Sequence, residues 1–135
     1  MPPSSQLPTS KEIETPPRVV YIVSTLPTFA ILGEFEVVVL MAVLHLGDDA
    51  YGSAIRDEIE RRSGRSASRG AVYITLERLE EKGLLASRTD AGSDSRGGRP
   101  KRLFRPTADG IKSLKRAVSL MTRMHKGLEP ILGDL

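Results

Sequence analysis

The sequence predicts a mainly α-helical fold with a small β-hairpin. In several segments of the 135-residue chain, apolar residues recur at spacings of three and four, which is typical of helices that bury one face. Two short segments, at 84–91 and 101–106, each contain an apolar pair and flank a loop rich in Gly and charge, and this arrangement predicts a hairpin. The length suits one domain of ordinary size, and 39% hydrophobic residues without Trp predict a small aliphatic core.

The N-terminal part of the chain divides into two segments. Residues 1–18 are predicted to be a disordered tail, because Pro, Ser and Thr dominate them and few apolar groups could offset the entropy of ordering. Residues 19–31 are largely apolar, but they are shorter than the roughly 20 residues of a membrane span, and Pro27 interrupts them. We therefore expect a peripheral extension that packs on the domain or on a partner subunit, and no membrane partner.

Two helices are predicted over residues 33–47 and 50–64. The first segment is almost continuously apolar and is too long for a typical strand, so we expect a central helix that is buried on most sides. The second segment follows Asp48 and Asp49, whose side chains can cap its N-terminus and suit the positive end of the helix dipole. Gly64 is expected to end this helix.

A third helix is predicted from the N-cap Ser68 to about residue 82, with Gly83 as its terminator. The side opposite its apolar face is uncharged or basic near the N-terminus and acidic near the C-terminus. The buried face is defined by three residues at spacings of four and three, which are Val72, Leu76 and Leu79.

A fourth helix is predicted at residues 107–128, after the hairpin, with Thr107 as its N-cap. An apolar seam runs along it for just under three heptads, and a monomer has little to cover such a seam. We therefore expect this helix to join two copies of the chain, and residues 129–135 to form a tail. The seam consists of Ile111, Leu114, Val118, Met121, His125 and Leu128.

The predicted order is helix, helix, helix, strand, basic loop, strand and helix. This is the order of a winged helix-turn-helix, here over residues 32–106, followed by a C-terminal dimerisation helix. In such a domain the helix before the hairpin enters the major groove of DNA with its N-terminal residues at the bases. Helix 68–82 is therefore the predicted recognition helix, and residues 92–102 form the predicted basic wing.

The positive charge of the chain is concentrated in the hairpin. Residues 86–106 contain six basic and two acidic residues, an excess of four, whereas the net charge of the whole chain is +3. A basic loop with glycines can approach a phosphate backbone closely, and its arginines can enter a narrow minor groove. The alternative is a solvated loop whose charges only keep the protein soluble.

Candidate DNA contacts lie on the outer face and flanks of the recognition helix and in the wing. Basic side chains there can bind phosphates or a guanine edge, and the other side chains can supply polar or apolar contacts in the groove. A packed, half-buried ring is an equally good interpretation of the tyrosine. The predicted contacts are Ser68, Arg69, Tyr73, Ile74, Thr75 and Arg78 in the helix, and Arg96, Arg99, Lys101 and Arg102 in the wing.

Three stretches resemble the PadR family of bacterial transcriptional regulators. They are LGEFEVVVLMAVLHLGDDAYGSAIRDEIERRSG at 32–64, SRGAVYITLERLEEKGLL at 68–85 and GGRPKRLFRPTADG at 97–110. The resemblance implies a homodimeric winged-helix DNA-binding protein, usually a repressor, of the smaller subgroup with one C-terminal helix. It also implies that, as in some members, a small aromatic or drug-like effector binds at the dimer interface and releases the DNA.

The resemblance also assigns roles to single residues. The chain departs from the family at Arg69 and Ile74, where proline is common, so its operator preference is expected to differ. The residues that match the family's recognition-helix and wing patterns are Ser68, Tyr73, Thr75, Arg99 and Lys101.

The predicted function is that of a cytoplasmic, sequence-specific transcriptional regulator, a homodimeric repressor that reads an inverted repeat in double-stranded operator DNA.

 It is expected to bind this operator through the recognition helix 68–82 and the wing 92–102. The alternative is a winged-helix module that binds another protein and no DNA, which the charge of the wing disfavours.

An enzyme is disfavoured by the residues present. The histidines are His45, which is expected against the core near a helix end, and His125 in the seam. No Cys, paired carboxylates, metal-ligand spacing or phosphate-binding loop is evident in the sequence. We therefore expect no catalytic residues, no metal and no cofactor.

Overall fold

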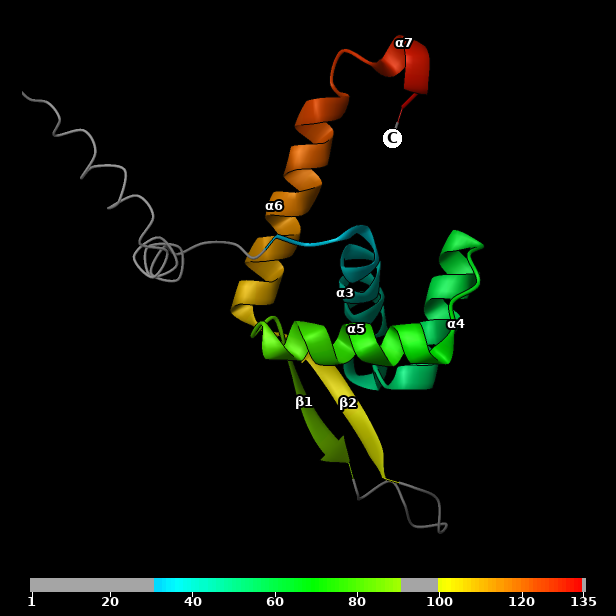
Figure 1. The fold of residues 1–135 in the computed structure, drawn as a ribbon, viewed down its shortest axis with the longest axis vertical. Coiled ribbons are helices and arrows are strands. Elements are labelled where there is room, and N and C mark those ends of the chain that lie inside the picture. The colour runs from blue at the N-terminus through cyan, green and yellow to red at the C-terminus, as the bar shows by residue number, and fades with distance from the viewer. Residues whose placement is uncertain (1–30, 91–99, 135) are drawn as a thin grey trace, which may run out of the picture.

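The computed structural model describes residues 31–90 and 100–134 (Figure 1). The predicted tail 1–18, the predicted extension 19–31 apart from Ile31, and the loop 91–99 lie outside the described residues. Three helices come first, then two antiparallel strands, then two further helices, so the predicted fold class is confirmed. Their bounds are α3 Glu34–Leu46, α4 Gly52–Ser63, α5 Arg69–Glu81, β1 Leu85–Asp90, β2 Lys101–Pro106, α6 Ala108–His125 and α7 Glu129–Leu132.

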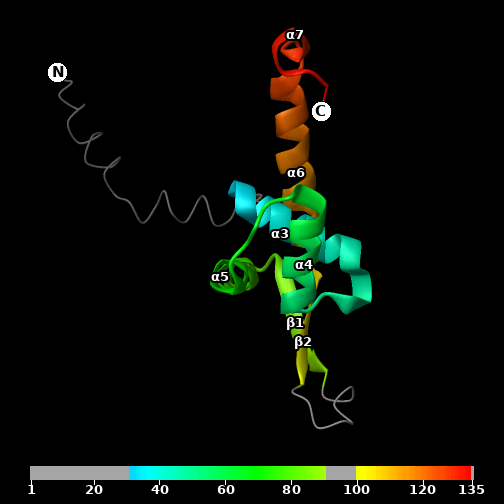
Figure 2. The same cartoon turned by 90° about the vertical axis from the view of Figure 1, so that its right-hand side faces the viewer.

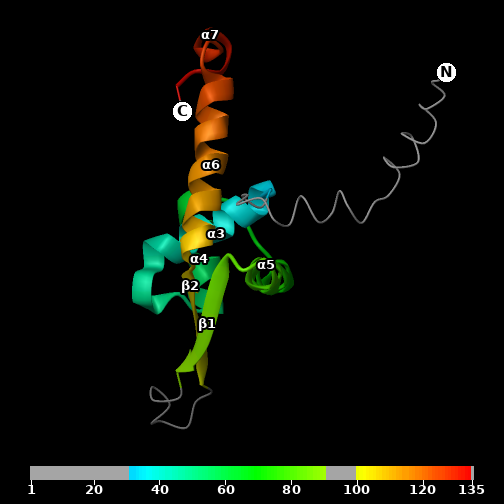
Figure 3. The same cartoon turned by 90° about the vertical axis from the view of Figure 1, so that its left-hand side faces the viewer.

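The described elements form a three-helix body with projections at both ends. Helices α3, α4 and α5 pack together, and α5 lies across the base of the β1–β2 hairpin (Figure 1). The hairpin and α6 extend from this body in opposite directions, and α7 lies at the far end of α6 (Figure 2 and Figure 3). The hairpin and the far half of α6 are therefore the parts that stand out from the core.

The core lies where α3 meets α4 and α5. On α3, Val39 and Leu40 are fully buried, and Ile55 of α4 packs in the same cluster. The apolar face predicted for the third helix is confirmed, because all three of its residues are fully buried. These residues are Val72, Leu76 and Leu79.

The outer face of α3 is exposed. Met41 and Leu44 are more than a third exposed, so the prediction that this helix is buried on most sides is wrong for the described chain. His45 is also exposed, although it was expected against the core. The reason is geometric, because the contacts of α3 with α4, α5, α6 and β2 leave Met41 and Leu44 uncovered among the described residues.

Two of the predicted helix caps are present and one is not. The Ser68 hydroxyl accepts a hydrogen bond from the N–H of Ala71 at 3.0 Å, and Thr107 caps α6 in the same way. Asp48 and Asp49 do not cap α4, because they lie in a separate 3-10 turn before it.

The hairpin is fastened to the start of α4. Its register pairs Leu85 with Pro106 at the base and Asp90 with Lys101 at the far end. Beyond this ladder, the N–H of Phe104 donates to the carbonyl of Ala50 at 2.8 Å. The direction of the hairpin is therefore set by the segment that precedes α4.

The first turns of α6 pack on the winged domain. The N–H of Thr107 donates to the carbonyl of Leu84 at 3.0 Å, and a Cβ added at Gly110 would overlap that same carbonyl. Leu114 is only 7% exposed and belongs to the core. Its prediction as a dimerisation residue is therefore wrong. Leu114 lies one turn after Gly110, and the close approach of Gly110 to Leu84 directs the Leu114 side chain into the core of the same chain.

The C-terminal segment continues beyond α6. Residues 129–132, expected as part of a tail, form the short helix α7. The Nε2 atom of His125 lies 2.6 Å from the carbonyl oxygen of Gly133, which ties this end back to α6. None of the helices within residues 31–90 and 100–134 is long and apolar enough to span a bilayer.

Candidate nucleic-acid interface

The outer side of α5 carries small, basic and apolar groups toward its N-terminus and the exposed carboxylates of Glu77 and Glu81 toward its C-terminus. Arg69, Gly70, Ile74 and Arg78 are all exposed there. At 100° per residue, Gly70 and Ile74 lie on the side away from the three buried residues of this helix. Ser68, the N-cap, is exposed at the end of the same surface. The structure thus exposes four of the six helix candidates, which are Ser68, Arg69, Ile74 and Arg78.

Tyr73 joins the outer surface to the body. Its ring packs so closely on Gly52 of α4 that a Cβ at position 52 would overlap the phenol. The guanidinium of Arg69 lies 5.7 Å from the centroid of the ring, within range of a cation–π interaction. Tyr73 is half-buried, so it both packs against α4 and holds Arg69.

Thr75 does not lie on the outer surface. Its side chain is buried, with 6% exposure for the residue, and its hydroxyl donates to the carbonyl of Ala71 at 2.8 Å. Thr75 follows Val72 by three residues and precedes Leu79 by four, so it shares their buried side. The buried position leaves Thr75 outside the set of side chains that could touch a ligand.

The two faces of the hairpin hold their basic residues differently. On one face, the Nζ atom of Lys101 lies 4.3 Å from the centroid of the Tyr51 ring and the side chain is exposed. On the other face, the guanidinium of Arg102 pairs with the carboxylate of Glu80 on α5. Arg102 also donates from Nε to the Ser87 hydroxyl at 3.1 Å. Arg96 and Arg99 lie outside the described residues.

An ion pair connects the C-terminal end of α5 with the start of α3. Lys82 Nζ donates to both carboxylate oxygens of Glu36, at 2.8 and 2.9 Å, and the N–H of Gly33 donates to the same carboxylate at 2.8 Å. Burial alone would raise the pKa of Glu36, but these hydrogen bonds and the charge of Lys82 outweigh it. The pKa of Glu36 is therefore below its usual value.

A family model settles the relationship of the chain to known proteins. The model described as "Transcriptional regulator PadR-like family" matches residues 40–116, which run from α3 through α5 and the hairpin into α6. The chain belongs to the PadR-like family. Members of this family are transcriptional regulators, so the prediction of a non-enzyme is confirmed.

Solved structures of PadR proteins share the fold. A PadR family regulator from Eggerthella lenta DSM 2243 is 25% identical, with a TM-score of 0.57, over 76% of this chain and 88% of that one. One from Clostridium difficile R20291 is 22% identical, with a TM-score of 0.60, over 73% and 99%. Bacillus subtilis PadR, solved in complex with operator DNA, is 21% identical, with a TM-score of 0.54, over 63% and 46%. The search of curated protein sequences finds no match.

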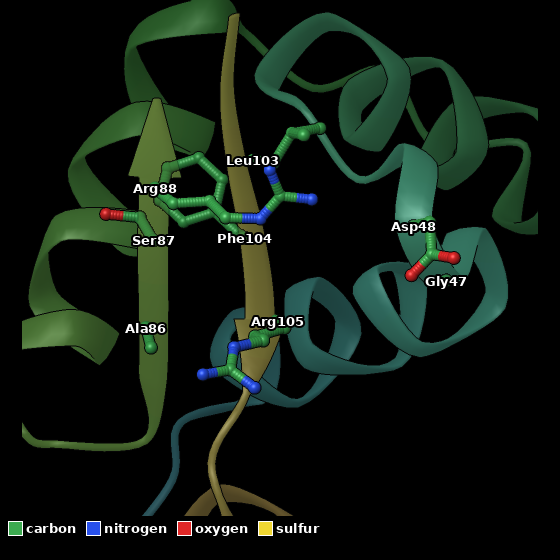
Figure 4. A pocket seen from close by; sticks show the side chains of 8 residues that line it. All are labelled: Gly47, Asp48, Ala86, Ser87, Arg88, Leu103, Phe104 and Arg105. Atoms are coloured by element: carbon green, nitrogen blue, oxygen red, sulfur yellow. The ribbon is translucent and has the colours of Figure 1, made fainter. Parts of the chain in front are cut away.

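Two basic residues of this PadR-like chain are absent from the predicted contacts. Arg88 of β1 and Arg105 of β2 lie on one face of the hairpin and line a pocket that Gly47 and Asp48 border on one side (Figure 4). Strand alternation places them there, so the sequence held a signal for both. The pocket measures about 100 Å³, whereas sites for small molecules usually exceed about 300 Å³. It is therefore too small for a drug-sized ligand.

The described residues of the PadR-like chain offer no metal site, because nowhere in 31–90 and 100–134 do three His, Asp or Glu side chains gather. The N-terminal half of the α5 surface and the hairpin offer mainly cations, hydroxyls and one apolar side chain, whereas Glu77 and Glu81 make the C-terminal half of that surface acidic. This is the chemistry that binds phosphates and base edges.

Proposed function

We propose that the chain is a sequence-specific regulator that binds double-stranded operator DNA as a cytoplasmic homodimer and represses transcription. Residues 32–106 form the DNA-binding domain, and residues 107–128 join the two copies. The observation that carries the proposal is the exposed outer side of α5, with Ser68, Arg69 and Ile74 toward its N-terminus, directly beside the hairpin that carries Lys101. A duplex that receives α5 in its major groove places backbone phosphates next to the hairpin.

The two elements divide the work of binding. Ser68 and Arg69, at the positive end of the α5 dipole, meet phosphates and base edges first, and Tyr73 orients Arg69. Lys101 supplies a cation from the hairpin. The buried Thr75 is left out, and Arg102 acts mainly by holding the hairpin against α5. The remaining contacts of the proposal are Ile74 and Arg78 on α5 and Arg96 and Arg99 in the wing.

The exposed half of the α6 seam supports the homodimer. Met121 is 59% exposed and Val118 is 41% exposed, and the described residues leave both uncovered at the far end of the molecule. Met124, three residues beyond Met121, extends the same apolar side. A second copy covers such a seam when two helices pack with their axes about 8–10 Å apart. The other seam residues in the proposed interface are Ile111, His125 and Leu128.

The outer face of α3 is the second part of the proposed interface. Met41 and Leu44 are exposed on it, and a dimer that uses α3 as well as α6 would cover both. The two α5 helices would then lie about 34 Å apart and enter successive major grooves of an inverted repeat. Repression, and release by a small aromatic or drug-like effector between the subunits, are included on the strength of the family resemblance.

The deciding experiment is selection of bound sites from random duplex DNA by the full chain. We expect an enriched inverted repeat whose half-site centres are one helical turn apart. Affinity for that site should fall with salt at a log–log slope of about −0.9 per phosphate contacted. The variant Lys101→Glu should lose binding, whereas Lys112→Glu, the same charge change at an exposed position of α6 away from the seam, should keep it.

The competing function is a winged-helix module that binds a protein. It would be favoured if the selection enriches no sequence and if Lys101→Glu has no more effect than Lys112→Glu. A direct repeat or a single half-site would retain DNA binding but refute the symmetric dimer.

A further inference from the structure

Ile74 is a large apolar side chain in polar surroundings. It is 56% exposed on the outer side of α5, whereas Val72 and Leu76 of the same helix are fully buried. Among the described residues from Gly52 to Leu103, Ile74 is the one large hydrophobic residue that is exposed. The core therefore does not account for an isoleucine at this position.

The helix surface one turn to the N-terminal side of Ile74 carries only small residues. Gly70 precedes Ile74 by one turn, and a Cβ added at Gly70 meets nothing within 4 Å. The neighbouring Ala71 is exposed and adds only a methyl group. A flat partner can therefore approach the helix closely enough to touch the side chain of Ile74.

Charged side chains flank the isoleucine along the helix, with the exposed carboxylate of Glu77 three residues beyond it and arginines on both sides. Arg69 lies near the Tyr73 ring at the N-terminal end, and Arg78 lies one turn beyond Ile74. A protein-docking surface needs a contiguous apolar patch at its centre, and a single isoleucine between arginines is not one. An apolar point between cations suits the major groove, where a base edge lies between two phosphate backbones.

We propose that Ile74 contacts the 5-methyl group of a thymine in each operator half-site. The inference rests on the proposed function, and it adds a base preference to it. The 5-methyl group is the apolar group that a T·A pair presents in the major groove, and a C·G pair has none at that place. Contact removes the methyl group and the isoleucine side chain from water together.

The effect of one methyl contact can be estimated. Burying a methyl-sized group is worth roughly a fourfold change in affinity for each half-site. Because a homodimer makes the contact twice, the full operator should show a change of roughly 15-fold.

The test replaces thymine by deoxyuridine, which lacks only this methyl group. The selected operator is made with symmetric dT→dU changes at one position of both half-sites at a time, and binding is measured for wild type and Ile74→Ala. Wild type should lose roughly 15-fold at one position. Ile74→Ala should bind the unmodified operator about as weakly as wild type binds that dU operator. The dU change should then reduce the affinity of Ile74→Ala only slightly further.

The outcomes separate this inference from the function beneath it. If a selected operator binds with the expected salt dependence but no dU position affects wild type, the thymine contact is refuted and the regulator stands. Equal losses of wild type and Ile74→Ala at the sensitive position assign the methyl contact to another residue. If selection yields no operator, both proposals fail. Thermal unfolding of Ile74→Ala checks that the variant is folded.

Discussion

The guanidinium of Arg102 on β2 pairs with the carboxylate of Glu80 near the end of α5. The same guanidinium lies 5.0 Å from the centroid of the Phe104 ring, and Ser87 donates to Glu80 at 2.6 Å. These contacts join the hairpin to α5 across 22 residues of sequence. Because Glu80 already balances its charge, Arg102 sets the angle between the two elements more than it attracts phosphate.

This arrangement predicts different salt dependences for neighbouring residues. Lys101→Ala should weaken operator binding and reduce the log–log salt slope by about 0.9 for each subunit, because an exposed cation is lost. Arg102→Ala should weaken binding with an almost unchanged slope. Fluorescence anisotropy between about 50 and 200 mM salt measures both slopes. A slope reduced equally by the two variants would make Arg102 a phosphate contact.

A second prediction concerns the junction of α6 with the hairpin. Gly110→Ala places a Cβ against the backbone carbonyl of Leu84, which cannot move away as a side chain could. We expect a loss of about 1–3 kcal/mol in the free energy of unfolding, measured with urea. Gly70→Ala is the matched control, because a Cβ there meets open space and should stabilise α5 by up to about 1 kcal/mol. Equal effects of the two changes would contradict the close approach.

The pH dependence of stability should depend on Glu36. Its pKa is lowered in the folded state, so the stability that its ion pair contributes is present above the unfolded value of about 4.3 and is lost as pH falls through the folded value. At pH 7, Glu36→Gln should unfold with roughly 1–2 kcal/mol less free energy than wild type. This difference should shrink as the pH is lowered from about 5 to 3.

Glu34→Gln provides the control for that measurement. Glu34 stands at the same end of α3 and pairs with Arg65 at 3.1 Å, but its side chain is 79% exposed. An exposed pair contributes little, so this variant should follow wild type across the whole pH range. A pH-independent gap for Glu36→Gln would mean that the loss comes from packing.

The fourth prediction tests the α6 seam. Met121→Glu places a charge in the proposed interface and should give a monomer in sedimentation at micromolar concentration. Ser119→Glu makes the same charge change about 200° around the helix, at an exposed position, and should leave a dimer. If Met121→Glu remains a dimer with unchanged affinity, the second copy lies elsewhere.

The sequence alone predicts those parts of the structure that local rules control. The N-cap of α5 at Ser68 and the α6 cap at Thr107 follow from residue type and position, and both are present. Thr75 is predicted as a DNA contact but is buried. Its spacing of three residues from Val72 and four from Leu79 already indicated that it shares their buried side.

The remaining features depend on contacts between distant residues. No local pattern shows that Glu80 pairs with Arg102, or that Gly110 meets the carbonyl of Leu84. The second contact explains why Leu114 belongs to the core while Val118, one turn later, is exposed. An apolar seam along a helix does not tell which of its turns face the same chain and which face another.

Helix α6 is continuous for 18 residues, about 27 Å, and its first turns are fixed to the winged domain. The helix and the domain therefore move as one rigid arm. If the crossing angle of two such arms changed by about 10°, a point at the other end of the arm would shift by about 5 Å, which is more than one base-pair step of about 3.4 Å. The crossing angle thus decides which half-site spacing the pair can span.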